Sequence, residues 1–288
     1  MKGIILAGGS GSRLYPLTQV ITKQLQPIYD KPMIYYPLSL LMLGGIKEIL
    51  LITTAEDLPR FKKLLKDGSQ WGIKLKYAIQ ERPRGLPEAF IIGEEFIAND
   101  DVTLILGDNL FYGDISFFKN ALQSKAKACA FAYPVRDPER YGVIEFEPKT
   151  FQVLSLEEKP KVPKSKYAIP GLYIFDHTVV EKAKKVTPGS RGETEIVEIL
   201  KMYMNDNQLH AEVISRGVAW LDTGTPKSFL EASSYIGAIE ERQGLKVACL
   251  EEIALRMNFI NRDQFEQSIK LIPNCNYRNY LIEIGKEF

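Results

Sequence analysis

Short apolar runs alternate with stretches of helical periodicity through the first half of the chain. The runs hold four to six residues and are rich in Ile and Leu, which is typical of strands buried on both faces. Between them, apolar side chains recur with the spacing of amphipathic helices. We predict strands at residues 3–6, 48–53, 75–80 and 102–106 and helices at 32–43, 58–66 and 88–96. This alternation predicts a parallel, doubly wound α/β sheet.

The second half of the chain has strand-like runs without long helices between them. Such runs favour antiparallel strands that extend the same sheet. They lie at residues 128–135, 142–146, 153–156 and 167–175. Helices are predicted at 178–185 and 193–205, a strand at 211–215, and a helix from 225 to 239. Beyond residue 245, three short amphipathic segments at 251–257, 263–271 and 277–285 predict a helical appendix.

A glycine-rich segment directly follows the first predicted strand. Gly8, Gly9 and Gly11 lie within four positions of one another. Glycines let backbone N–H groups approach and point at phosphate oxygens, and Arg13 and Lys23 add positive charge nearby. The segment therefore indicates a polyphosphate site, with a nucleotide as the first ligand to expect. The alternative is a glycine-rich turn without a ligand.

Two common phosphate-binding motifs do not fit this segment. A Walker loop requires Gly-Lys-Ser/Thr after a glycine and four further residues, but Gly-Lys occurs only at 285–286. A dinucleotide fingerprint would need a small residue where Leu14 stands and an acidic residue at the end of the strand 48–53. The loop is therefore of another type.

Two aspartates, Asp108 and Asp222, stand at the ends of predicted elements. Carboxylates beside a phosphate loop commonly hold Mg²⁺, which prefers oxygen ligands and also binds substrate phosphates. Asp108 follows the strand 102–106, and ligands of doubly wound sheets lie beyond the carboxyl ends of strands, so it should share a crevice with the glycine loop. Asp222 is either a second ligand or a helix cap or Asx turn. With only His177 and His210 in the chain, a multi-histidine metal site is not expected.

Charged residues at 157–160 end an apolar strand at its rim. Glu158 could accept hydrogen bonds from a sugar hydroxyl, and Lys159 could contact a sugar phosphate. The alternative is a solvated strand edge. The stretch 159–166, rich in lysine and proline, is predicted to be an exposed loop or lid.

Composition narrows the classes of partner. The 37 Lys and Arg residues balance 36 Asp and Glu, and a formal net charge of +1 argues against a general nucleic-acid binder. No apolar run approaches the length needed to cross a membrane, so no membrane partner is expected. The cysteines Cys129, Cys249 and Cys275 are widely spaced, which indicates neither a disulfide framework nor a zinc site and fits a cytoplasmic location.

A series of short motifs runs through nearly the whole chain. Leu-Ala-Gly-Gly-Ser-Gly-Ser-Arg-Leu occupies 6–14, and Lys-Pro-Met-Ile-Tyr-Tyr-Pro occupies 31–37. Further motifs are Leu-Gly-Asp-Asn at 106–109, Asp-Pro-Glu-Arg-Tyr-Gly-Val at 137–143, Glu-Glu-Lys-Pro at 157–160, Trp-Leu-Asp-Thr-Gly at 220–224 and Glu-Glu-Arg-Gln-Gly at 240–244. Together they resemble the sugar-1-phosphate nucleotidylyltransferases, and within that family the thymidylyltransferase branch. The fold that this implies is a Rossmann-like, mostly parallel sheet of nucleotidyltransferase type.

The resemblance implies a role for each matching position. The implied catalytic residues, which neutralise phosphate charge, are Arg13, Lys23 and Lys159. The implied nucleotide contacts are Gly8, Gly9, Gly11, Ser12, Arg13, Gln24, Gln80, Gly85 and Asp108. The implied sugar-phosphate contacts are Asn109, Gly142, Glu158, Lys159 and Ile169. Asp108 and Asp222 match the Mg²⁺ ligands, and the amide of Gln80 suits the paired carbonyl and imide edge of thymine or uracil.

The activity implied by the resemblance is transfer of a thymidylyl group from dTTP to α-D-glucose 1-phosphate. The products are dTDP-glucose and pyrophosphate, formed by in-line displacement assisted by Mg²⁺, as a first step toward dTDP-deoxysugars such as rhamnose. Residues 1–240 would form the catalytic domain, with a nucleotide half at about 1–110 and a sugar-phosphate half at about 111–240. The appendix, 241–288, would contribute contacts to a homotetramer.

Three segments depart from the family pattern. Residues 83–89 read Pro-Arg-Gly-Leu-Pro-Glu-Ala where the family typically has Pro-Asp-Gly-Leu-Ala-Gln-Ala, and this places Arg84 near the base. Pro170 replaces a threonine close to the sugar pocket. Asp-Ile at 114–115 stands where His-Asp is usual, near a turn at which relatives bind a second nucleotide. The departures bear on base and sugar preference and on feedback inhibition.

Three other functions are alternatives to this interpretation. Uridylyl transfer from UTP, or use of another sugar 1-phosphate, is the nearest, because thymine and uracil differ by one methyl group. A glycosyltransferase would usually carry Asp-x-Asp, where this chain has Gly-Asp-Asn at 107–109. An inactive nucleotide-sugar sensing subunit would be expected to lose Arg13, Lys23, Asp108 or Asp222, and all four are present.

Overall fold

The apolar runs of the first half form the parallel part of one sheet. The computed structural model describes residues 1–9, 11–189 and 192–288, so Ser10 of the glycine loop lies outside the described residues. The parallel strands are β1 (Lys2–Leu6), β4 (Glu48–Thr53), β5 (Lys74–Ile79) and β6 (Val102–Leu106). β1 lies between β4 and β6, so the loop that leaves β1 emerges at the centre of the carboxyl edge.

The sheet continues into an antiparallel part through β12. Its order is β10-β9-β11-β8-β12-β6-β1-β4-β5, with β13 beside β8. The added strands are β8 (Ala128–Pro134), β9 (Gly142–Phe146), β10 (Val153–Glu158), β11 (Tyr167–Ala168), β12 (Leu172–Phe175) and β13 (Leu209–Val213). β13 is parallel to β8, whereas the other added pairs are antiparallel. The doubly wound fold with antiparallel additions is therefore confirmed.

One predicted strand is in fact two. The run 167–175 breaks at Pro170 and Gly171, because proline has no N–H to donate to a neighbouring strand. The piece before the break pairs with β8 and β9, and the piece after it pairs with β6 and β8.

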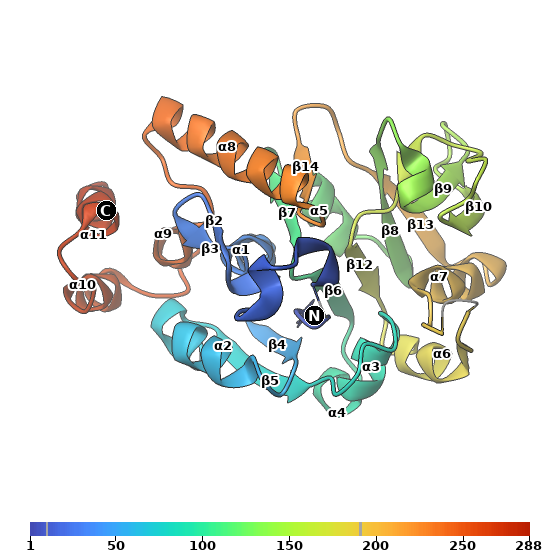
Figure 1. Cartoon of the computed structure of the whole chain (residues 1–288), viewed down its shortest axis with the longest axis horizontal. Coiled ribbons are helices and arrows are strands. Elements are labelled where there is room, and N and C mark those ends of the chain that lie inside the picture. The colour runs from blue at the N-terminus through green and yellow to red at the C-terminus, as the bar shows by residue number, and fades with distance from the viewer. Residues whose placement is uncertain (10, 190–191) are drawn as a thin grey trace.

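Helices cover both faces of the sheet (Figure 1). Ile5 belongs to the core on one face, with Leu38, Phe61 and Phe118, and Ile4 belongs to the core on the other face, with Phe90. The helices are α1 (Tyr35–Leu43), α2 (Leu58–Leu65), α3 (Glu88–Ile92), α4 (Glu94–Ile97), α5 (Ser116–Leu122), α6 (Val179–Lys185), α7 (Ile196–Asn205) and α8 (Pro226–Gln243).

The predicted helix 88–96 is interrupted at Gly93. A Cβ there would lie 3.0 Å from both the carbonyl oxygen of Ala89 and Cδ1 of Ile4, so a larger residue would require these neighbours to move. The result is two short helices, α3 and α4, in place of one.

The helical appendix is confirmed as α9 (Leu250–Arg256), α10 (Arg262–Lys270) and α11 (Asn276–Gly285). Figure 1 shows it at the opposite end of the molecule from β9 and β10. Leu250, Phe265 and Leu281 are buried in the core cluster that also holds Leu38 of α1. The boundary predicted at residue 240 falls in the last turn of α8. No helix in the described part of the chain is long and apolar enough to cross a membrane.

Sequence analysis did not predict a two-stranded ribbon that joins the two halves. β7 (Asn109–Tyr112) pairs antiparallel with β14 (Ala219–Asp222), and Asn109 lies opposite Asp222. A second small hairpin is formed by β2 (Pro27–Ile28) and β3 (Lys31–Pro32). The first ribbon brings the ends of two distant segments to the carboxyl edge of the sheet.

Candidate active site

The glycine loop leaves β1 in a conformation that requires glycine. Gly9 has φ +109° and Gly11 has φ +57°, both in the region that favours glycine. A Cβ on Gly11 would lie 2.6 Å from Cγ2 of Thr18, and the Thr18 hydroxyl donates a 2.9 Å hydrogen bond to the carbonyl of Gly11. A single 3₁₀ turn, Ser12–Leu14, then carries Arg13. The loop thus leaves its backbone open on two sides.

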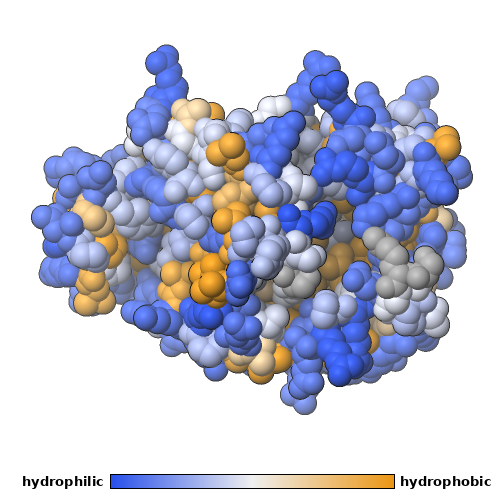
Figure 2. Space-filling model, viewed as in Figure 1, coloured by the Kyte–Doolittle hydropathy of each residue, from blue (hydrophilic) through white to orange (hydrophobic). Residues whose placement is uncertain are grey.

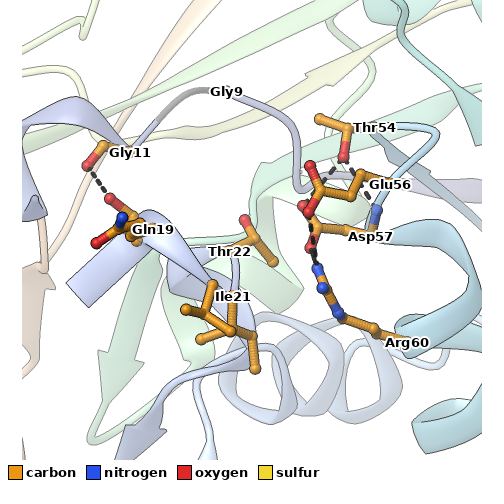
Figure 3. A pocket seen from close by; sticks show the side chains of 11 residues that line it. Gly9, Gly11, Gln19, Ile21, Thr22, Thr54, Glu56, Asp57 and Arg60 are labelled. Carbon is orange, nitrogen blue, oxygen red and sulfur yellow. Dashed lines mark hydrogen bonds and ion pairs between the residues drawn. The ribbon is translucent and has the colours of Figure 1, made fainter. Parts of the chain in front are cut away.

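A cavity of about 190 Å³ lies on the outer side of the loop. Figure 3 shows it between Gly9, Gly11 and the start of α2. Thr54 donates to Asp57 at 3.0 Å, and Asp57 accepts a 2.8 Å hydrogen bond from Arg60. Since the two acidic side chains on this side, Glu56 and Asp57, outnumber its one arginine, the outer cavity is unsuited to a polyphosphate.

A second cavity, of about 210 Å³, lies on the inner side of the loop. Its lining includes the cationic side chains of Arg13 and Lys23, which is the charge that a triphosphate requires. The other lining residues are Gly8, Gly9, Gly11, Ser12, Leu14, Pro83, Glu193 and Gly224. The structure therefore places the predicted phosphate contacts together on the inner side.

Lys23 has a structural partner that sequence analysis did not foresee. Its Nζ forms an ion pair with Oδ2 of Asp108, and both side chains are largely buried. Burial alone would raise the pKa of Asp108, but the charge and hydrogen bond of Lys23, with a 3.0 Å hydrogen bond from Asn109, hold that pKa below its usual range. Asp108 is thus an anion at neutral pH, and it lies beside the glycine loop.

Asp222 lies at the end of β14 and closes the same crevice. Its Oδ1 accepts a 3.0 Å hydrogen bond from the backbone of Gly224, which is an Asx turn. The helix-cap alternative is wrong, because Thr225 caps α8 by accepting from the backbone N–H of Ser228 at 3.2 Å. Burial raises the pKa of Asp222, and the negative charge of Asp108 raises it further.

The two aspartates form a donor set that fits a hard cation. Repulsion between Asp108 and Asp222 is visible in the raised pKa of Asp222, and a divalent cation between them would relieve it. Among the described residues, no group of three or more His, Cys, Asp or Glu side chains could hold a metal. A cation here would therefore need further oxygen ligands from water or from a substrate phosphate.

Asn109 connects the segments that meet at Asp108. Its Oδ1 accepts hydrogen bonds from the backbone of Gly171 at 3.0 Å and from Nε1 of Trp220 at 2.7 Å, while its Nδ2 donates to Asp108. The hydroxyl of Thr223 donates to the carbonyl of Asp108 at 2.9 Å. Because these polar groups are buried and paired, the position of Asp108 is fixed before any ligand binds.

A third cavity, of about 300 Å³, adjoins the aspartates. Figure 2 shows a hollow right of centre on this face, with polar side chains around it. The cavity brings together predicted residues from both halves of the chain: Arg13, Asp108, Asn109, Gly142, Glu158, Lys159, Ile169 and Asp222. Its size and mixed polar and apolar walls suit a sugar phosphate.

Glu158 and Lys159 both line this cavity because the backbone turns between them. Successive side chains of a strand point to opposite faces, but β10 ends at Glu158 and Lys159 adopts φ +45°. The backbone N–H of Lys159 donates to the carbonyl of Tyr141 at 3.0 Å, and its Nζ lies 3.1 Å from Oε1 of Glu158. A left-handed lysine is strained, and such strain is often found at functional sites.

Sequence analysis missed six polar or aromatic residues of the cavity wall. They are Arg140, Tyr141, Tyr173, Glu193, Glu195 and Trp220. The rings of Tyr141 and Trp220 pack edge to face, with centroids 5.1 Å apart, and burial together with the charge of Asp222 raises the pKa of Tyr141 to about 12. Arg140 and Tyr141 lie within the motif at 137–143, which was the available signal.

Two predicted nucleotide contacts lie at the far side of the loop, and one lies apart. Gln80 is next to Gly8, and Gly85 pairs with Thr194 close to Pro83. Gln24 is buried, and its Oε1 accepts a 2.7 Å hydrogen bond from Thr22. None of Gln24, Gln80 and Gly85 lines the three cavities, so their roles in nucleotide binding stay predictions.

Replacement of Gly85 by alanine is expected to lower the free energy of unfolding by about 3 kcal/mol. Gly85 has φ +113°, and a Cβ there would lie 2.0 Å from the carbonyl oxygen of Thr194, so both strain and a backbone clash oppose the change. Denaturant unfolding would measure the loss.

The matched control for that substitution is Gly45→Ala. Gly45 also has a positive φ, of +82°, but a Cβ there would meet no atom within 4 Å. Strain alone should cost about 1 kcal/mol in this variant. Equal losses in the two variants would show that the contact between Gly85 and Thr194 contributes nothing.

Comparison with known proteins places the chain among nucleotide-transferring enzymes. The family model described as nucleotidyl transferase matches residues 2–238. A glucose-1-phosphate thymidylyltransferase from Neisseria meningitidis is 51% identical over 290 residues and covers 100% of both chains. The protein of the same name from Mycobacterium tuberculosis is 50% identical and covers 99% of both.

Solved structures agree with these relatives. A glucose-1-phosphate thymidylyltransferase from Bacillus anthracis, in complex with sucrose, is 38% identical with a TM-score of 0.75 and covers 82% of this chain and 94% of its own. A UDP-glucose pyrophosphorylase bound to UDP-glucose has a TM-score of 0.73 at 24% identity, covering 84% of this chain and 99% of its own, and this likeness extends to the fold alone.

Proposed function

The chain belongs to the nucleotidyl transferase family, and on that basis we propose that it transfers a thymidylyl group from dTTP to glucose 1-phosphate, with release of dTDP-glucose and pyrophosphate. One observation carries the proposal. The inner loop cavity and the sugar-sized cavity share Arg13 in their walls. Lys23 of the inner cavity is paired with Asp108, which lines the sugar-sized cavity together with Asp222, Glu158 and Lys159. Relatives at about half identity over the full chain carry the name of this activity.

The reaction we propose is a single displacement. An oxygen of the sugar phosphate attacks the α-phosphorus of dTTP, the new P–O bond forms, and the bond to the β-phosphate breaks with its electron pair leaving on pyrophosphate. The nucleophile is already an anion, so neither a general base nor a covalent enzyme intermediate is required. Catalysis then depends on alignment and on charge neutralisation by Arg13, Lys23 and Lys159.

Nucleotidyltransferases generally use a divalent metal, and Mg²⁺ is the ion we propose here. Asp108 and Asp222 would hold it, since Mg²⁺ accepts one or two carboxylates and completes its shell with phosphate oxygens and water. When bound, the ion would offset the negative charge of the phosphates. Lys23, paired with Asp108, keeps that carboxylate ionised and in place.

Asp222→Asn is expected to raise the thermal midpoint of the metal-free protein at pH 7. The pKa of Asp222 is raised by burial and by Asp108, so the folded protein holds this proton more tightly than the unfolded chain does. Stability therefore falls as pH rises through the raised pKa, and asparagine removes that loss. Thermal unfolding with and without Mg²⁺ measures both the gain and the metal effect.

Mg²⁺ should raise the midpoint of the unsubstituted protein and have a smaller effect on Asp222→Asn. The exposed Asp263 provides a matched control, because Asp263→Asn makes the same chemical change away from the crevice and should leave the metal effect intact. A lower midpoint for Asp222→Asn, with an unchanged response to Mg²⁺, would contradict the metal assignment.

Pyrophosphate release tests the activity directly. The purified protein is incubated with glucose 1-phosphate and Mg²⁺ and with dTTP, UTP, CTP, ATP or GTP in turn. We expect dTTP to be used fastest and UTP more slowly, because one methyl group is worth only about 1–3 kcal/mol of discrimination. Release with UTP alone would favour the uridylyltransferase alternative. No release with any nucleotide would favour another sugar 1-phosphate or the sensing alternative.

The assembly proposed is a homotetramer with contacts from the appendix, residues 241–288. In support, large apolar side chains lie exposed there, among them Leu271 at 82% and Phe288 at 48%. Light scattering on the intact chain would measure the mass in solution, and a monomer would overturn this part of the proposal.

A further inference from the structure

The amide of Gln80 is held in one orientation. Its Nε2 donates a 2.7 Å hydrogen bond to Oε2 of Glu88, and the side chain is 5% exposed. A carboxylate accepts hydrogen bonds and donates none, so the nitrogen of the amide must face Glu88 and the oxygen must face away. The orientation thus follows from the chemistry of Glu88.

The side-chain oxygen of Gln80, Oε1, lies beside Gly8 of the glycine loop. A Cβ built on Gly8 would come 2.8 Å from this Oε1, and Gly8 lines the inner loop cavity. Within residues 1–9, 11–189 and 192–288, no group donates a hydrogen bond to Oε1, and it is not among their fully buried side-chain atoms without a partner. Gln80 therefore holds an acceptor oxygen directly beside Gly8, a residue of the inner cavity wall.

Glu88 lies where an acidic side chain is favoured. It lies in the first turn of α3, where the helix dipole favours an acidic side chain. The Nε of Arg84 lies 3.8 Å from its second oxygen, Oε1. Arg84 is mostly exposed, so its ion pair contributes little energy, but it leaves the hydrogen bond to Gln80 undisturbed.

We infer that Glu88 is a positioning residue for base specificity: by fixing the amide of Gln80, it makes the site accept an N–H from the base. Thymine and uracil carry such a donor at N3, whereas cytosine presents a lone pair there. An amide oxygen opposite N3 would be repelled by that lone pair, so cytosine nucleotides, whose N–H donors are on N4 instead, would bind less tightly. This inference rests on the proposed function, because it deepens the assignment of Gln80 to the base.

The residue type at position 88 decides whether the amide of Gln80 can reverse. Glutamine, which the family typically has there, both donates and accepts, so it would allow the amide of Gln80 to turn over. With the amide reversed, Nε2 would face the base and could donate to N3 of cytosine. Glu88 removes that freedom and makes the acceptor orientation permanent.

The test compares Glu88→Gln with the unsubstituted protein in binding and in turnover. Equilibrium binding of dTTP and of dCTP is measured by calorimetry in the presence of Mg²⁺, and kcat and KM are measured for both with glucose 1-phosphate. We expect the unsubstituted protein to prefer dTTP at least about 100-fold, and the preference to fall about tenfold in Glu88→Gln, mainly through tighter binding of dCTP. The preference for dTTP over dCTP would not change if Glu88 only stabilised the fold.

Glu95→Gln is the matched control, since Glu95 is exposed in the first turn of the next short helix, α4. Its preference for dTTP should equal that of the unsubstituted protein. Equal binding of dTTP and dCTP before any substitution, or an unchanged preference in Glu88→Gln, would overturn the inference. Base preference in binding without pyrophosphate release would overturn the proposed function and leave this inference standing.

Discussion

Pyrophosphate release should fall at least about 100-fold when Lys23 is replaced by methionine, because the phosphates lose a fixed positive charge at the reacting centre. The same change should lower the free energy of unfolding by about 3 kcal/mol, since Asp108 would be left as a buried, unpaired anion. Its pKa, now held low by Lys23, would then rise. Steady-state kinetics and denaturant unfolding measure the two effects separately.

A double variant tests the structural role of Lys23 through stability, because its activity is also lowered by the loss of Asp108, a proposed metal ligand. Adding Asp108→Asn to Lys23→Met removes the unpaired charge, so most of the lost stability should return while activity stays low. Recovery of both stability and activity would mean that the lysine acts only as a partner for Asp108. If the double variant lost as much stability as the two single variants together, the ion pair between Lys23 and Asp108 would contribute nothing to the free energy of unfolding.

Removal of the Lys159 side chain is expected to lower kcat/KM for the sugar phosphate about 100-fold. Two replacements distinguish charge from backbone strain. Lys159→Ala and Lys159→Gly lose the ammonium group equally, but only glycine relieves the left-handed conformation at φ +45°. The two variants should therefore be equally slow, with the glycine variant more stable by about 1 kcal/mol.

The control for the lysine series is Lys161→Ala, an exposed lysine two positions further along the same loop. It should leave both rate and stability nearly unchanged. A comparable loss of kcat/KM at Lys161 would indicate that general positive charge, rather than the position of Lys159 in the cavity, attracts the sugar phosphate.

The sequence predicted the parallel half of the fold well, because each buried strand there is a continuous apolar run. It failed where a break depends on tertiary contact. Gly93 splits a helix because the sheet approaches it closely, and Pro170 splits a strand whose two pieces find different neighbours. The ribbon of β7 and β14 was missed because its strands, Asn-Leu-Phe-Tyr and Ala-Trp-Leu-Asp, are short and each includes a polar end residue, so neither is a continuous apolar run.

The candidate site was predictable where function requires unusual residues in a local cluster, as in the glycine loop. It was not predictable where the wall is assembled from distant segments. Glu193 and Glu195 reach the cavity from a loop before α7, and nothing in their spacing relates them to Asp108. The partner of Lys23 was missed for the same reason, since no local pattern can reveal an ion pair across 85 positions.

The ribbon between β7 and β14 also has a consequence for the order in which the protein matures. Thr223 and Asp108 are 115 positions apart in the sequence. Only the pairing of β14 with β7 brings the carboxylate of Asp222 to that of Asp108. A chain emerging from the ribosome therefore holds the complete phosphate loop and Asp108 long before Asp222 has been synthesised. The proposed metal-binding pair cannot form until this late, long-range strand pairing is made, so a growing chain lacks part of the candidate site until about three quarters of it has been translated.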